Sequence, residues 1–105
     1  MTAAATRPAY RTITEIKAAN RAAGDHFFDR AQLRLFGTRI VTHVLAGSWF
    51  ITADHLVPAE APDFTIHRAQ HDGNITTLDG PALYHNWPTL AAARGAVRSL
   101  ALAAA

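Results

Sequence analysis

The chain has 105 residues, of which half are hydrophobic and 17% are charged, and its formal net charge is +2. This length supplies one hydrophobic core, so a two-domain organisation is excluded, and the composition is typical of a folded globule rather than a disordered chain. The sequence contains no cysteine, which excludes disulfides, zinc–thiolate sites, iron–sulfur clusters and thiol nucleophiles.

The first residues lack an ordered pattern and are followed by a helix signal. Residues 1–11 show no apolar period, so we expect a flexible arm there and a single domain over residues 12–105. Thr12 and Glu15 have the spacing of a capping box, in which the hydroxyl accepts an amide hydrogen bond and the carboxylate reaches back to the cap amide. Gly24 suits a left-handed residue after a helix end, which predicts a helix over 13–23.

The middle of the chain changes from a helical to a strand pattern. Asp29 can cap a second helix over 30–36 that ends at Gly37. Residues 38–44 and 48–53 are rich in β-branched and aromatic side chains and are separated by a glycine-bearing turn. This pattern predicts an antiparallel hairpin.

A second hairpin and a final helix follow. Phe64 and Ile66 alternate with polar residues, and His71-Asp72-Gly73-Asn74 predicts a turn before a strand over 75–78. Residues 82–85 suit a short fifth strand. The last helix opens over 86–89, and one of its faces carries an apolar stripe of Leu90, Ala93, Val97, Leu100 and Ala101. The sequence therefore predicts an α+β fold, with an antiparallel four- to five-stranded sheet whose N-terminal helices and C-terminal helix pack on one face.

One stretch is more specific than a generic helix. Residues 17–28 read K-A-A-N-R-A-A-G-D-H-F-F, and residues 35–40 read L-F-G-T-R-I. Over roughly residues 13–102 the chain resembles a family of small uncharacterised proteins encoded by phages, plasmids and integrative elements. The resemblance implies a mobile-element setting and the layout above, and it assigns no functional residue.

The histidines are the first candidates for chemistry, and there are six: His26, His43, His55, His67, His71 and His85. A metal site is one interpretation, because His67 and His71 are four residues apart, but that spacing spans a strand end and a turn rather than a helix. We favour histidines on strands and loops, with no metal and no cofactor. His26 lies between Asp25 and Asp29, which suits either a general-base pair or a hydrogen bond at a helix end; without an adjacent nucleophile the second is favoured.

Catalysis is not otherwise indicated, and we expect a non-enzymatic protein. The two serines, Ser48 and Ser99, have no G-x-S-x-G setting. The N-terminus lacks the apolar region of a secretory signal, and no uninterrupted apolar stretch is long enough to span a membrane. We therefore expect a cytoplasmic protein without a membrane partner.

Trp49 and Phe50 are adjacent on a predicted strand, so their side chains point to opposite faces of the sheet. If helices cover only one face, one of these rings is exposed and can anchor a protein partner.

Charge is unevenly distributed along the chain. Residues 1–40 carry seven basic and three acidic side chains, residues 41–85 carry one basic and five acidic, and residues 86–105 carry two basic. This pattern predicts a basic helical layer and an acidic side of sheet and loops. The candidate partner-binding residues are Trp49, Phe50, Asp54, Glu60, Asp63 and Asp72. The alternative nucleic-acid face consists of Arg21, Arg30, Arg34, Arg94 and Arg98.

Two functions fit these patterns. The first is a protein-binding domain of a phage or other mobile element that binds and inhibits a host protein, as an anti-CRISPR protein does. The second is a nucleic-acid-binding accessory protein that uses the arginine-bearing helices, although no helix-turn-helix, RNP or KH pattern accompanies them.

Overall fold

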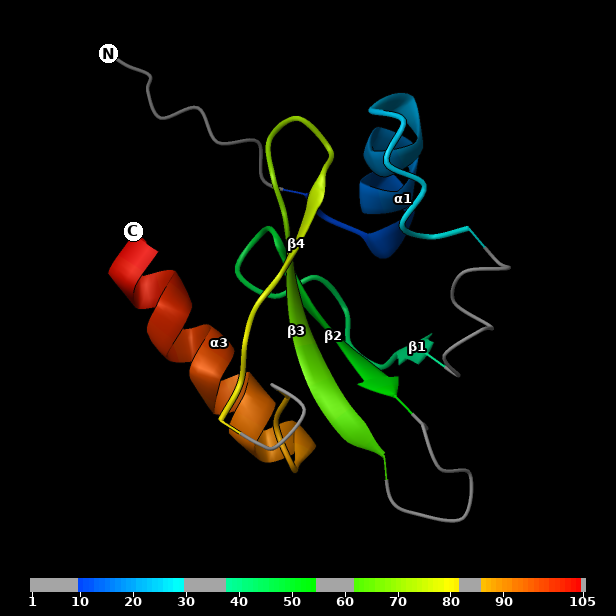
Figure 1. Cartoon of the computed structure of the whole chain (residues 1–105). Coiled ribbons are helices and arrows are strands. Elements are labelled where there is room, and N and C mark those ends of the chain that lie inside the picture. The colour runs from blue at the N-terminus through cyan, green and yellow to red at the C-terminus, as the bar shows by residue number, and fades with distance from the viewer. Residues whose placement is uncertain (1–9, 30–37, 55–61, 82–85, 105) are drawn as a thin grey trace.

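The computed structural model describes residues 10–29, 38–54, 62–81 and 86–104. The elements are, in chain order, α1 (Ile13–Ala22), β1 (Thr38–Ile40), β2 (Trp49–Asp54), β3 (Asp63–Ala69), β4 (Ile75–Thr77) and α3 (Leu90–Ala104). The strands form one sheet in the order β1-β2-β3-β4, and all neighbours are antiparallel (Figure 1). The predicted α+β class is thereby confirmed. The helix expected over 30–36, the strand expected over 82–85 and residues 1–9 of the expected arm lie outside the described residues.

Helix α1 begins at the predicted residue, Ile13, and ends at Ala22, one residue before the predicted end. The hydroxyl of Thr12 accepts a hydrogen bond from the Glu15 amide at 3.2 Å. The Glu15 carboxylate accepts one from the amide of Arg11 at 2.7 Å, one residue before the expected cap amide. Gly24 has φ +79°, so the left-handed residue after the helix is confirmed.

Strand β1 is shorter than expected and ends at Ile40, opposite Thr52 of β2. The chain leaves the regular ladder there because the hydroxyl of Thr42, rather than a backbone carbonyl, accepts the Ile51 amide hydrogen bond at 3.1 Å. The turn before β2 has positive φ at Ala46 and Gly47, and Leu45 bridges to Trp49 beyond it. The predicted hairpin therefore exists, with a wider connection between its two strands.

The second hairpin forms between β3 and β4, with Ala69 opposite Ile75. Gly73 in its turn has φ +93°, a conformation that favours glycine. Beyond β4, Phe64 and Trp87 exchange two backbone hydrogen bonds of 2.9 and 2.7 Å. The segment that leads into α3 is thus fastened to the sheet before the helix starts.

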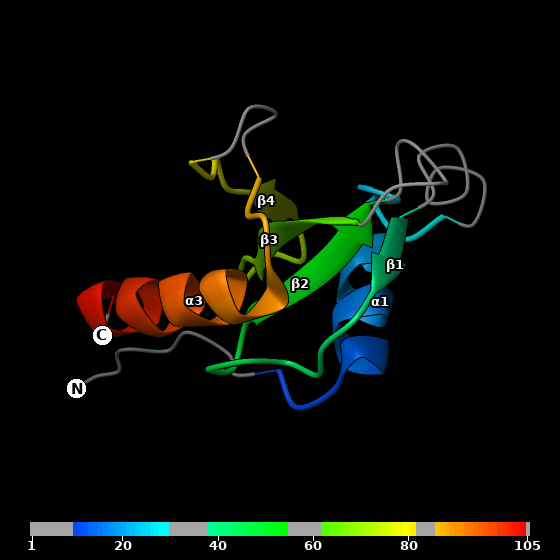
Figure 2. The same cartoon turned by 90° about the horizontal axis from the view of Figure 1, so that it is seen from below.

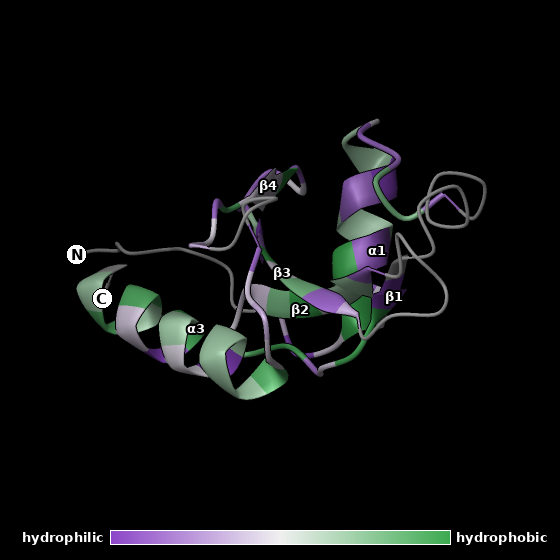
Figure 3. Cartoon of the chain, turned by 60° about the horizontal axis from the view of Figure 1, so that its bottom comes forward, coloured by the Kyte–Doolittle hydropathy of each residue, from purple (hydrophilic) through white to green (hydrophobic). Residues whose placement is uncertain are grey.

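Helix α3 lies along one face of the sheet. The hydroxyl of Thr89 accepts a hydrogen bond from the Ala92 amide at 3.1 Å, which caps the helix start. The predicted stripe is confirmed: Ala93 and Val97 are buried, and Leu90, Leu100 and Ala101 pack partly buried beside them. In Figure 3 the α3 ribbon is mostly green to white, with few hydrophilic positions. Neither helix of the described residues is long and apolar enough to cross a membrane.

The sheet separates two hydrophobic clusters. On the α3 face, the cluster consists of Trp49, Ile51, Ile66 and Trp87 together with Ala93 and Val97 of α3. On the other face lie Ile16 of α1, Phe50 and Ala69, with Tyr10, Phe27 and Phe28 packed against them. Figure 2 shows α1 and α3 on either side of the sheet.

The expectation that the helices share one face does not match this arrangement. Five successive residues of β2, Trp49 to Ala53, are buried. Such a continuous buried run is typical of a strand covered on both faces, whereas a strand covered on one face alternates apolar and polar residues. The two faces of β2 both carry large apolar side chains, Trp49 and Ile51 on one and Phe50 on the other, so each face needs a helix to cover it.

Candidate functional site

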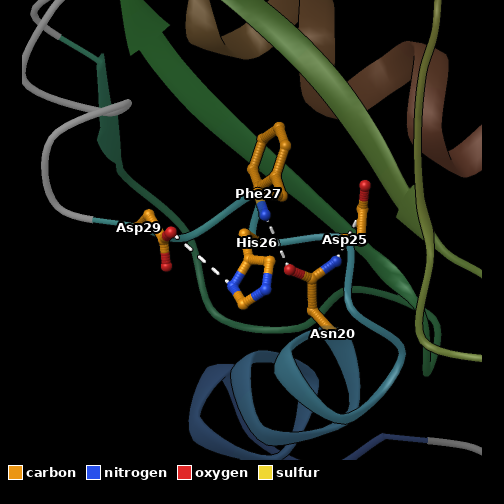
Figure 4. Close-up of polar contacts among 5 residues, drawn as sticks. All are labelled: Asn20, Asp25, His26, Phe27 and Asp29. Atoms are coloured by element: carbon orange, nitrogen blue, oxygen red, sulfur yellow. Dashed lines mark hydrogen bonds and ion pairs between the residues drawn. The ribbon is translucent and has the colours of Figure 1, made fainter.

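The most specific sequence stretch, residues 17–28, centres on the buried Asn20 near the end of α1 (Figure 4). Its amide nitrogen donates to Asp25 Oδ2 at 2.7 Å and to the Gly73 carbonyl at 2.9 Å. Its side-chain oxygen accepts the Phe27 amide at 2.8 Å. Asn20 therefore joins the chain after α1 to the β3–β4 turn, and its polar atoms have partners inside the fold.

Asp25 and Gly73 complete this junction. The same Asp25 oxygen accepts the amide of Ile75 at 3.1 Å, which ties α1 to the start of β4. A Cβ added at Gly73 would lie 2.2 Å from the Ala19 carbonyl oxygen, so only glycine allows this close approach of turn and helix. The stretch serves to dock α1 on the sheet.

His26 sits on the surface beside this junction. It has φ +56°, its side chain is 54% exposed, and its Nδ1 lies 3.6 Å from Asp29 Oδ2. Asp25, the other carboxylate considered for a general-base pair, is bound to Asn20 and the Ile75 amide instead. Of the two neighbouring carboxylates, the structure therefore places that of Asp29 beside the His26 ring.

His67 is the buried histidine of the described residues and lies on the α1 side of β3. Its Nε2 lies 2.8 Å from the Thr52 hydroxyl and its Nδ1 lies 2.9 Å from the Thr77 hydroxyl. Its ring stacks on Phe50, with centroids 5.1 Å apart, and contacts Phe27. Burial lowers the pKa of His67 to about 4, against a smaller opposing effect of the Asp54 carboxylate, so the ring is neutral at pH 7.

The remaining histidines do not join His67. His43 and His71 are exposed, and His55 and His85 lie outside the described residues. The part of the chain that the structure describes contains no group of three His, Asp or Glu side chains able to hold a metal ion. Both nitrogens of His67 already have hydroxyl partners, so the His67–His71 spacing has no metal geometry behind it.

The expectation of an exposed aromatic anchor at Trp49 or Phe50 is wrong. Trp49 is 4% exposed beneath α3, and Phe50 is fully buried on the α1 side. The two rings point to opposite faces of the sheet as predicted, but a helix covers each face. The Arg68 guanidinium lies 4.7 Å from the centre of the Trp49 ring, a cation–π contact that covers the indole further.

The predicted acidic residues are not one patch. Asp54 and Asp63 are paired across β2 and β3, both half-buried, and Asp54 accepts a hydrogen bond from the Thr65 hydroxyl at 2.7 Å. Asp72 lies in the β3–β4 turn, where the Asn74 amide donates to it and lowers the pKa of the carboxyl. Glu60 lies outside the described residues.

The predicted nucleic-acid face is divided by the sheet. Arg21 is exposed on α1, whereas Arg94 and Arg98 are exposed on α3, on the other side. Arg30 and Arg34 lie outside the described residues. The described arginines of this set therefore do not form a continuous basic surface.

Sequence reasoning missed a groove between α3 and the turn before β2. It has a volume of about 220 Å³ and is lined by Leu45, Ala46, Arg94, Val97 and Arg98. Its floor is aliphatic and two of its lining side chains are cationic. The i, i+4 spacing of Arg94 and Arg98 beside Val97 was visible in the sequence, but nothing local showed that residues 45–46 would face them.

Within the sheet, the two faces carry different charges. By strand register, Arg39 and Arg68 share the face of Trp49 and Ala53, which is the α3 face. Asp54 and Asp63 lie on the opposite face. The strands therefore present their arginines on the α3 side and their carboxylates on the α1 side, so the sheet is not the uniformly acidic layer that was expected. Both described helices carry more basic than acidic side chains.

Comparison with known proteins places this fold in a family. Residues 12–98 match the model of a family of unknown function, DUF7447. The chain belongs to this family. No curated protein and no solved structure matches the chain. The family match begins at Thr12, the cap of α1, and includes the Asn20 junction, both hairpins and the part of α3 that lines the groove.

Proposed function

We propose that this member of the family is a non-enzymatic binding protein of a mobile genetic element, which inhibits a host protein, as an anti-CRISPR protein does, by occupying part of its surface. The contact is made by the α3 face, at the groove between α3 and the turn before β2. The mobile-element setting rests on the sequence resemblance over residues 17–28 and 35–40.

The observation that carries this proposal is a difference between buried and exposed polar side chains. The buried side chains of Asn20 and His67 form their hydrogen bonds with partners inside the fold. The groove arginines, by contrast, are exposed and flank an aliphatic floor. Arginine beside an apolar anchor site is typical of protein–protein interfaces.

Nucleic-acid binding is the competing function. A duplex-binding protein positions itself by many phosphate contacts along a continuous basic surface. Here Arg21 is on α1 and the pair Arg94 and Arg98 is on α3, and these helices lie on opposite sides of the sheet (Figure 2). This separation favours a protein partner over a duplex.

Site-specific photocrosslinking in host cells tests the proposal. Ala91 is exposed one turn before Arg94 on α3, and Ala18 is exposed on α1. With p-benzoylphenylalanine in place of Ala91 we expect a discrete protein adduct that is lost when Arg94 and Arg98 are both changed to Glu. The same probe in place of Ala18 is the matched control and should give no such adduct.

The nature and effect of the adduct decide the outcome. A protease-sensitive adduct whose purified host component loses activity on addition of the unmodified chain supports the proposal. Absence of a protein adduct at position 91, or a nuclease-sensitive adduct there, contradicts it.

A further inference from the structure

The groove on the α3 face has a defined chemical character. Leu45, Ala46 and Val97 supply its aliphatic lining, and Arg94 and Arg98 supply its cations. The two arginines are one helical turn apart on α3, a rise of about 6 Å, so their guanidinium groups can address two separate anionic groups. Each guanidinium offers a planar fork of donors that matches one carboxylate.

The arginines lack a carboxylate partner in the described part of the chain. Across residues 10–29, 38–54, 62–81 and 86–104, the ion pair present joins His26 and Asp29, far from α3 in the sequence. Register places the strand carboxylates Asp54 and Asp63 on the opposite face of the sheet. The positive charge at the groove is therefore not neutralised by the strands beneath it.

The size of the groove limits what enters it. At about 220 Å³ it is smaller than the roughly 300–1,000 Å³ that encloses a small-molecule ligand. It is open and aliphatic, which suits one apolar side chain presented by a larger partner. A phosphate backbone would offer the arginines anions but nothing apolar for the accessible surfaces of Leu45 and Ala46.

We propose that the groove binds an acidic peptide segment of the partner protein, with an aliphatic side chain against Leu45 and Ala46 and carboxylates on Arg94 and Arg98. This inference rests on the proposed function and names the chemistry of the partner at the same site. The segment is recognised by apolar contact and charge together, so neither feature alone binds well.

A peptide titration tests this chemistry on the full chain. The probe is a capped hexapeptide of glutamate and leucine, followed by the methyl signals of Leu45 and Val97 in NMR spectra. We expect saturable shifts at these methyls and binding about tenfold weaker when glutamine replaces every glutamate in the peptide. The Arg94→Gln/Arg98→Gln variant should lose a similar factor, whereas Arg21→Gln, an exposed arginine on the other face, should bind as the unmodified chain does.

Four outcomes would overturn the inference. The first is equal binding of the glutamine and glutamate peptides, and the second is a set of NMR shifts confined to residues outside the groove. The third is binding of a 12-base-pair DNA duplex to the groove when the acidic peptide does not bind. The fourth is a concentration-dependent dimer in sedimentation whose formation alone shifts the same methyl signals. The last result would mean that a second copy of the chain fills the groove.

The peptide and crosslinking experiments fail independently. If the peptide does not bind but the probe at position 91 captures a host protein, the acidic-segment inference fails and the proposed function stands. If the peptide binds but no host protein is captured, the proposed function fails while the groove keeps its specificity for acidic segments.

Discussion

The buried His67 makes the stability of this fold depend on pH in a defined direction. Burial lowers its pKa from the ordinary 6.5 to about 4 in the folded chain. Between these two values the unfolded chain binds a proton that the folded chain does not, so the free energy of unfolding falls as the pH falls. The contribution is fully present above pH 6.5 and is lost progressively toward pH 4.

The size of the effect follows from the width of this window. Each pH unit within it is worth about 1.4 kcal/mol, so lowering the pH from 7 to 5 should reduce the free energy of unfolding by about 2 kcal/mol. Urea denaturation at pH 7, 6 and 5, followed by the fluorescence of the buried Trp49 and Trp87, measures this loss.

Two variants isolate the contribution of His67. In His67→Gln the side chain keeps hydrogen-bonding capacity toward Thr52 and Thr77 but does not titrate, so most of the loss between pH 7 and 5 should vanish. His26→Gln removes an exposed histidine and should leave the loss in place. An equal loss in His67→Gln and the unmodified chain would refute the reasoning, as would an NMR titration in which the ring of His67 protonates near pH 6.5.

Three further predictions concern packing. Gly73→Ala should lower the free energy of unfolding by about 3 kcal/mol or more, since the new Cβ meets backbone atoms and φ is positive. Gly24→Ala, whose Cβ meets open space at positive φ, should lower it by about 1–2 kcal/mol. Equal losses of stability in thermal denaturation would contradict the close approach of Gly73 to α1. Asn20→Ala should cost about 2–4 kcal/mol by leaving buried groups without partners, with faster hydrogen exchange in the loop after α1, and unchanged exchange there would disprove the junction. Trp49→Ala should cost about 3–5 kcal/mol in urea denaturation, against almost nothing for Leu102→Ala, which is 74% exposed; a small loss at Trp49 would mean that the ring is not part of the core.

Features set by neighbouring residues were predictable from the sequence. The Thr12 cap, the left-handed Gly24 and the turn at Gly73 each depend on a few adjacent positions, and the structure has all three. The stripe on α3 was equally clear, because its period of about 3.6 residues is a property of the helix alone.

Features that depend on distant segments were not predictable in this way. Adjacent strand residues necessarily point to opposite faces, but the sequence of β2 does not say whether a helix covers each face, and both Trp49 and Phe50 proved buried. The groove combines a turn at residues 45–46 with α3 residues about 50 positions later, so only the packing of α3 on the sheet creates it. The hydroxyl partners of His67, the buried Thr52 and the exposed Thr77, come from two other strands.

When helices cover both faces of a sheet, apolar residues alone do not fix the register of its strands. Shifting β2 by one residue would exchange Trp49 and Phe50 between two apolar environments, at less cost than moving either ring into water. The hydroxyl of Thr52 distinguishes the two alignments, because such a shift would turn Thr52 away from His67 and leave the buried Nε2 of that ring without its partner. The buried hydrogen bond between Thr52 and His67 thus determines which face of β2 points toward α1, which the apolar residues of β2 do not determine.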